Sequence, residues 1–102
     1  ALFVADYENH MIRRVEVATG AVTTVVGSGI RGSVDGVGDA AQFCTPTGIA
    51  LSPDGGVLFV ADKQQDPAGG GGDGGNHKIR RVEVATGEVT TTATTRSGSR
   101  AV

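Results

Sequence analysis

Two histidines are the first candidates for metal chemistry in this chain. His10 and His77 each follow an asparagine, in the identical dipeptides Asn9-His10 and Asn76-His77. Histidine is a frequent zinc ligand, but no cysteine or carboxylate completes a zinc-ligand spacing around either one. Each histidine also occupies the same position of a repeated segment. We therefore interpret the Asn-His dipeptides as structural features of two similar hairpins, and we predict no metal site.

The aspartates around a glycine-rich stretch suggest calcium or phosphate binding. Asp66 and Asp73 lie in DPAGGGGDGG, shortly after Asp62. The spacing of these three carboxylates matches no EF-hand loop. The glycines are not followed by the Lys-Ser/Thr of a phosphate-binding P-loop, nor by a helix. We interpret the stretch as a flexible tether and predict no cofactor.

Three other residues have side chains that could take part in catalysis, and we interpret each of them as structural. Asp6 and Asp62 each end the segment LFVAD, and we expect them to accept hydrogen bonds from backbone N–H groups of the following turn. Cys44 is the only cysteine, so it forms no internal disulfide, and a free cysteine is usually a small buried hydrophobe. We predict no catalytic residue and no enzymatic activity.

Two pairs of adjacent arginines carry the only concentrated positive charge: Arg13, Arg14, Arg80 and Arg81. On a strand, the two side chains of a pair point to opposite faces of the sheet. Glu16 and Glu83 lie two residues beyond Arg14 and Arg81, on the same face. We therefore predict one ion pair between Arg14 and Glu16 and another between Arg81 and Glu83.

The overall charge does not favour nucleic acid or a membrane as partner. The formal net charge is −2, from 9 Lys and Arg against 11 Asp and Glu. RNA binding stays an alternative, but it requires a basic surface with stacking aromatics, and Tyr7 is the only aromatic expected there. No apolar run approaches the roughly 18 residues of a membrane span.

An internal repeat shows which elements position these residues. LFVAD at 2–6 returns at 58–62. NHMIRRVEVATGAVTT at 9–24 returns as NHKIRRVEVATGEVTT at 76–91, and the second copy carries a Gly-rich insertion at 63–75. The chain has 17 glycines and 3 prolines, which favours a β protein with many tight turns.

The repeated segments predict short antiparallel strands joined by turns. The second copy predicts a four-stranded meander, with strands at 47–52, 57–62, 78–85 and 88–93. The first copy supplies the last three of these strands, at 2–6, 11–18 and 21–26. In LFVAD one face carries Leu2 and Val4 and the other carries Phe3 and Ala5, so both faces are apolar. Such a sheet must be covered on both sides, as in the radially stacked sheets of a β-propeller.

The repeated segments resemble a known family. Three segments are similar to NHL repeats: LFVADYENHMIRRVEVATG, GSVDGVGDAAQFCTPTGIALSPDGG and NHKIRRVEVATG. The Asn-His dipeptide matches the first two letters of that name. The Leu position of the third letter is taken by the Ile or Val of the following strand. The resemblance implies an all-β fold, a partial β-propeller of four-stranded antiparallel meander blades of NHL type. Members of the family serve as scaffolds for protein binding, RNA binding, ligand sensing or, in amidating-lyase relatives, zinc-dependent catalysis.

The predicted organisation follows from the two copies. Residues 1–26 form the last three strands of a first blade, 27–45 the inter-blade connection, 46–93 the second blade, and 94–102 a truncated connection or tail. Within the connection, we expect Ala40, Ala41 and Phe43 to pack as a short helical turn. About one and three-quarter blades cannot close a ring, so we expect further propeller blades, or copies of the chain, to complete it.

We expect a non-enzymatic scaffold that binds a protein partner through loops at one end of the blades. The segments 27–45 and 63–75 share this end, which we call the loop face. The candidate binding residues on the loop face are Tyr7, Glu8, Arg31, Lys63, Asp66 and Asp73. The structural positions of the repeat are Asp6, Asn9, His10, Asp62, Asn76 and His77. An RNA-binding surface and a zinc-dependent lyase-like propeller are the alternative functions.

Overall fold

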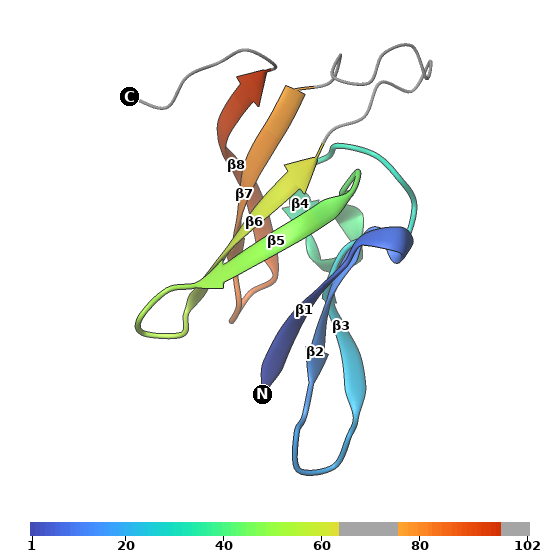
Figure 1. The fold of residues 1–102 in the computed structure, drawn as a ribbon, viewed down its shortest axis with the longest axis vertical. Helices are drawn as coiled ribbons and strands as arrows, with labels where there is room; N and C mark the ends of the chain where they lie inside the picture. The colour runs from blue at the N-terminus through green and yellow to red at the C-terminus, as the bar shows by residue number, and fades with distance from the viewer. Residues whose placement is uncertain (64–75, 97–102) are drawn as a thin grey trace.

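The computed structural model describes residues 1–63 and 76–96 of the chain, which form two antiparallel sheets (Figure 1). The first sheet has three strands in sequence order, β1 (Leu2–Asp6), β2 (Met11–Val15) and β3 (Val22–Val26). A 3-10 helix, η1 (Tyr7–Asn9), joins β1 to β2. These are the three strands that the first copy of the repeat predicts.

The second sheet contains the complete meander that the second copy predicts. Its strands are β5 (Pro46–Leu51), β6 (Val57–Lys63), β7 (Asn76–Glu83) and β8 (Glu88–Arg96). A two-residue strand that the sequence did not predict, β4 (Gly36–Val37), pairs with the outer edge of β8, so the order is β4-β8-β7-β6-β5. The predicted all-β fold of propeller-type meander blades is therefore confirmed.

The strand ends differ from the predicted ones by a few residues. The largest differences are of three residues: β8 ends at Arg96 and not at 93, and β2 was predicted to run to residue 18 but ends at Val15. Here the N–H of Glu16 donates to the Ala21 carbonyl, and Gly20 donates back to the Glu16 carbonyl. Gly20 has a φ of 76°, a left-handed conformation that glycine adopts without steric cost. The Thr-Gly turn therefore begins earlier than the apolar pattern indicates.

The two copies of the repeat have the same backbone register. Phe3 pairs with Arg14 across β1 and β2, and its counterpart Phe59 pairs with Arg81 across β6 and β7. Both copies also carry a register shift directly before an arginine, between Ile12 and Arg13 in one copy and between the matching residues of β7 in the other. The same sequence thus produces the same local geometry twice.

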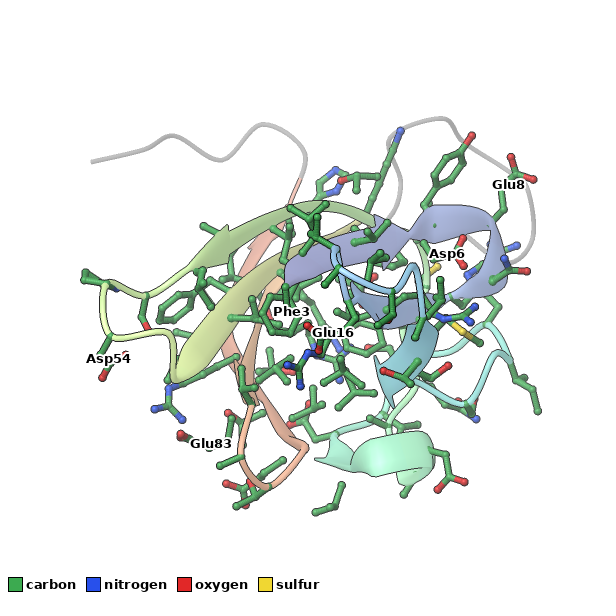
Figure 2. All side chains as sticks on the ribbon, turned by 90° about the horizontal axis from the view of Figure 1, so that it is seen from below. Phe3, Asp6, Glu8, Glu16, Asp54 and Glu83 are labelled. Carbon is green, nitrogen blue, oxygen red and sulfur yellow. The ribbon has the colours of Figure 1, made fainter. Side chains whose placement is uncertain are left out.

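The hydrophobic core lies between the two sheets. Its buried members come from both sheets and from the connection between them: Ile12, Val26, Ala41, Phe43, Leu58, Val60, Val82 and Val89. Figure 2 shows Phe3 directed between the sheets, while Glu8 and Asp54 project from opposite ends. Burial of these side chains is the main favourable term that holds the two sheets together.

The connection includes the short helical turn that the sequence predicts. A 3-10 helix, η2 (Gly38–Ala40), is followed by Ala41 and Phe43, both fully buried. Ala40 is exposed, so its predicted packing was wrong. The turn lies against the core on one side only, and Ala40 is on the outer side. Among the described residues, no helix has the length and apolarity needed to cross a membrane.

Each sheet is covered on one face. In β6, Leu58 and Val60 are buried against the first sheet, whereas Phe59 between them is 38% exposed. In β1 the pattern is reversed, because Phe3 and Ala5 face the core and Leu2 and Val4 are exposed. The expectation that further blades or copies cover the second faces stays a prediction.

Candidate functional site

A buried arginine is the centre of the largest polar cluster in the described chain. The Arg80 side chain, on β7, is 0% exposed. Its Nη1 donates to the Asp62 carboxylate at 3.0 Å and to the Gln42 carbonyl at 2.9 Å. Its Nη2 donates to the Asp35 carboxylate and the Val34 carbonyl, both at 2.9 Å. Burying a charge is costly unless it is paired and hydrogen-bonded, and these contacts meet both needs.

The two carboxylates bind other parts of the chain as well. Asp62, on β6, accepts hydrogen bonds from the backbone N–H groups of Cys44 and Thr45, each at 3.0 Å. Asp35 accepts from the Thr91 hydroxyl at 2.8 Å and from the Thr91 N–H at 3.2 Å. We name Asp35, Asp62, Arg80 and Thr91 the connection clamp. It fastens segment 27–45 to three strands of the second sheet.

The electrostatics of the clamp favour its ionised form. Partial burial raises the pKa of Asp35, but hydrogen bonds from Thr91 and Arg80 and the charge of Arg80 outweigh burial and lower it below 3.8. Asp35 is therefore an anion at neutral pH. The Phe43 ring lies under the guanidinium of Arg80, with 4.9 Å from Cζ to the ring centroid, which adds a cation–π contact.

The aspartates that end the LFVAD segments have other partners than those predicted. We expected backbone donors in the following turn. The described donors to Asp62 are Arg80 and the N–H groups of the preceding connection, and the turn that follows Asp62 lies outside the described residues. Asp6 accepts from the Asn9 side-chain amide at 3.0 Å and forms an ion pair with Arg13 at 3.5 Å. For Asp6, a side-chain amide and a charged donor therefore take the place of the predicted backbone donors, whereas the expectation for Asp62 stays a prediction.

The predicted ion pairs and the buried thiol are confirmed. Arg14 pairs with Glu16 at 3.0 Å, and Arg81 pairs with Glu83 at 2.8 Å. Cys44 is buried. These residues are structural, and the glutamate pairs lie at the surface, where such pairs contribute little to stability.

The Asn-His dipeptides occupy different backbone environments. His10 ends η1 in a left-handed conformation, with a φ of 56°, and is half-buried. His77 lies inside β7, opposite Lys63 on β6, because β6 and β7 extend further than the matching strands β1 and β2. Within the described ranges, no group of three His, Cys, Asp or Glu side chains is arranged to hold a metal ion.

The loop-face candidates lie on three separate segments. Tyr7, which is 53% exposed, and Glu8 are on η1, Arg31 is in the connection, and Lys63 ends β6; all four are exposed. In Figure 2, Glu8 extends away from the strands beyond η1. The remaining candidates, Asp66 and Asp73, lie outside the described residues.

The backbone places η1 and the start of the connection at the same end of the sheets. Gly27 is so close to the turn after η1 that a Cβ added to it would lie 2.8 Å from the His10 carbonyl oxygen. At the same end, the Lys63 N–H donates to the Thr45 carbonyl at 3.0 Å. A cleft of about 190 Å³ opens beside Lys63 and is lined in part by Thr47, Ala61, His77, Lys78 and Ile79.

Comparison with known proteins identifies the repeats. NHL repeat-containing protein 2 from Bos taurus is 37% identical to this chain over 96% of the chain and 13% of its own length. The two repeats of the present chain belong to the NHL-repeat family. The human NHL repeat-containing protein 2 is also 37% identical, over 92% of the chain. Protein SUPPRESSOR OF QUENCHING 1, chloroplastic, from Arabidopsis thaliana is 32% identical over 85% of the chain.

These relatives are much longer than the chain. The chain spans between 7% and 13% of their lengths. No family model matches it. The NHL similarity therefore supports the blade architecture of the two sheets.

Proposed function

We propose that this NHL-repeat segment is a non-enzymatic interaction scaffold that binds a protein partner through its loop face. The observation that carries the proposal is the exposed Tyr7 on η1, at the end of the blades where the connection is fastened. Tyrosine is enriched among the residues that dominate protein–protein binding, because it combines a large apolar ring with a hydroxyl. The blades supply a rigid support, and loops on rigid supports commonly carry recognition.

The charges of the loop-face candidates favour a protein partner over RNA. Glu8 is negative, whereas Arg31 and Lys63 are positive, so the exposed groups have both signs. A mixed polar rim around an aromatic residue is typical of protein interfaces. An RNA surface would instead present uniform positive charge and several stacking aromatics.

The proposal is tested by using the chain as bait and identifying the proteins that co-purify. Tyr7→Ala is expected to weaken the specific partner by roughly 30-fold or more, as loss of about 2 kcal/mol at an interface centre does. Val17→Ser is the matched control, because Val17 is 67% exposed and lies in the β2–β3 turn at the opposite end. This control should retain the partner.

Three results would redirect the proposal. If Tyr7→Ala and Val17→Ser bind equally well, the loop face is not the binding surface. If the retained ligand is nucleic acid and its affinity falls steeply with salt, the RNA alternative holds. If the purified protein contains stoichiometric zinc by elemental analysis, the lyase-like alternative replaces the scaffold.

A further inference from the structure

The exposed face of the first sheet carries the same residues as the buried face of the second. We call it the open face: Leu2, Val4, Asp6, Arg13, Val15, Val22 and Thr24. Its counterparts in the second copy are Leu58, Val60, Asp62, Arg80, Val82, Val89 and Thr91. The latter set contains three members of the connection clamp and four residues of the core. The described residues therefore present one surface twice, once covered by the connection and once exposed or half-buried.

The apolar part of the open face differs from its counterpart mainly in exposure. Leu2 is 58% exposed, whereas the matching Leu58 is 1% exposed. Val4 is 41% exposed, whereas the matching Val60 is fully buried. These side chains have the hydrophobic surface of a core position, and no segment among residues 1–63 and 76–96 covers them.

The polar part of the open face has the donors of the clamp and the counterpart of Asp62, but it lacks the acceptors that the connection supplies. Arg80 donates to two carboxylates and two carbonyls. Arg13 has a single ionic partner within the described chain, Asp6, at 3.5 Å. Thr91 gives its hydroxyl and its N–H to Asp35, while the Thr24 hydroxyl is directed at the Met11 sulfur at 3.5 Å, a weak acceptor.

The backbone of the open face already has the geometry of the occupied one. Arg13 lies opposite Thr24 on β3, as Arg80 lies opposite Thr91 on β8. The register shift before the arginine is present in both sheets. Binding therefore requires no rearrangement of the strands, only an occupant with complementary groups.

We propose that the open face binds an extended peptide segment with the chemistry of residues 33–45. Such a segment supplies a carboxylate at the position of Asp35 for Arg13 and Thr24. It supplies an aromatic ring at the spacing of Phe43, to pack against the Arg13 guanidinium and the exposed Leu2 and Val4. Two consecutive backbone N–H groups after the ring donate to Asp6, as those of Cys44 and Thr45 donate to Asp62.

Charge complementarity favours this segment over a second copy of the chain. A second copy offers the exposed side of its own second sheet, where Phe59 and Ala61 match the Phe3 and Ala5 that cover the core. This arrangement buries apolar surface but brings no carboxylate to Arg13, because each copy uses its Asp35 on its own Arg80. A segment of the connection type satisfies both the apolar and the charged parts of the open face.

The proposal is tested by fluorescence anisotropy with a labelled peptide of residues 27–45 carrying Cys44→Ser, titrated with the whole chain. Arg13→Gln in the chain, or Asp35→Asn in the peptide, should each weaken binding by at least tenfold. Arg14→Gln is the matched control, because Arg14 is the adjacent residue, points to the other face and pairs with Glu16. This control should bind within twofold of the parent.

The effects of the two substitutions on peptide affinity should not be additive. With Arg13→Gln in the chain, Asp35→Asn in the peptide should have little further effect, because both remove the same ion pair. Circular dichroism checks that Arg13→Gln is folded, and Thr24→Val replaces it as the test if it is not. The proposal is overturned if the peptide does not bind, if both arginine variants weaken it equally, or if sedimentation shows self-association that Arg13→Gln leaves unchanged.

Discussion

Asp62→Asn is expected to destabilise the protein far more than the same substitution at Asp6, although both residues end the sequence LFVAD. The Asp62 side chain is 0% exposed and accepts hydrogen bonds from Arg80, Cys44 and Thr45. Asparagine keeps the shape of the side chain but replaces one acceptor oxygen by a donor. If the amide nitrogen faces the guanidinium, two donors meet; if it faces the connection, a backbone N–H loses its acceptor.

The magnitude follows from the burial of the pair. Removing one partner of a buried ion pair costs about 3–5 kcal/mol, and Asp35, which still neutralises Arg80, places the expected loss near 3 kcal/mol. Asp6 and Arg13 are 27% and 29% exposed and lie 3.5 Å apart, so their pair resembles a surface salt bridge worth up to about 1 kcal/mol. For a domain of this size, a loss of about 3 kcal/mol lowers Tm by about 12–24 °C.

The measurement is urea denaturation at neutral pH, followed by far-UV circular dichroism, for the parent and both variants. If the slope of the unfolding free energy against urea concentration is the same for the three proteins, their folded and unfolded states are comparable. Thr91→Val, which removes one donor to Asp35, is a milder substitution in the same clamp and should fall between the two. If Asp62→Asn and Asp6→Asn lower the unfolding free energy by amounts within about 0.5 kcal/mol of each other, the clamp does not stabilise the fold more than a surface ion pair does.

Two more predictions concern the connection. Because hydrogen bonds and the charge of Arg80 hold the pKa of Asp35 below 3.8, ionised Asp35 stabilises the fold above that pH, and the contribution is lost as pH falls through the lowered pKa. Asp35→Asn should therefore flatten the acid side of the stability profile, measured by urea titrations between about pH 2 and 5, and an unaltered profile would contradict this. Phe43→Ala should cost about 3–5 kcal/mol, against about 1 kcal/mol for Phe59→Ala, which is 38% exposed; equal losses in thermal melts would show that the connection is not anchored through its ring.

Much of the fold could be predicted because its signals are local. Alternating apolar residues and Thr-Gly turns appear in both copies, and they locate the strands to within a few residues. The strand β4 could not be predicted in this way, since Gly36 and Val37 are too few to show a period of two. Its pairing with β8 depends on how the connection folds back over the sheet.

The clamp was missed for a related reason. Asp35 and Arg80 are 45 residues apart, so nothing in the local sequence joins them. The local interpretation of Asp62, as a residue that binds the next turn, was the one that neighbouring residues suggested. The recurrence of an aspartate and an arginine in both copies was the available signal, because it placed them on the same face of adjacent strands, two residues apart in register. Leu2 and Leu58 show the same limit, since identical segments differ in burial when their neighbours differ.

The double attachment of the connection has a consequence for how the molecule unfolds. Ala41 and Phe43 of the connection share the core with Ile12 and Val26 of the first sheet, and at its centre Asp35 binds two strands of the second sheet. Melting of either sheet therefore strips contacts from the segment on which the other depends. We therefore expect the two blades to unfold as one cooperative unit, unlike a linear array whose repeats fray one at a time from an end.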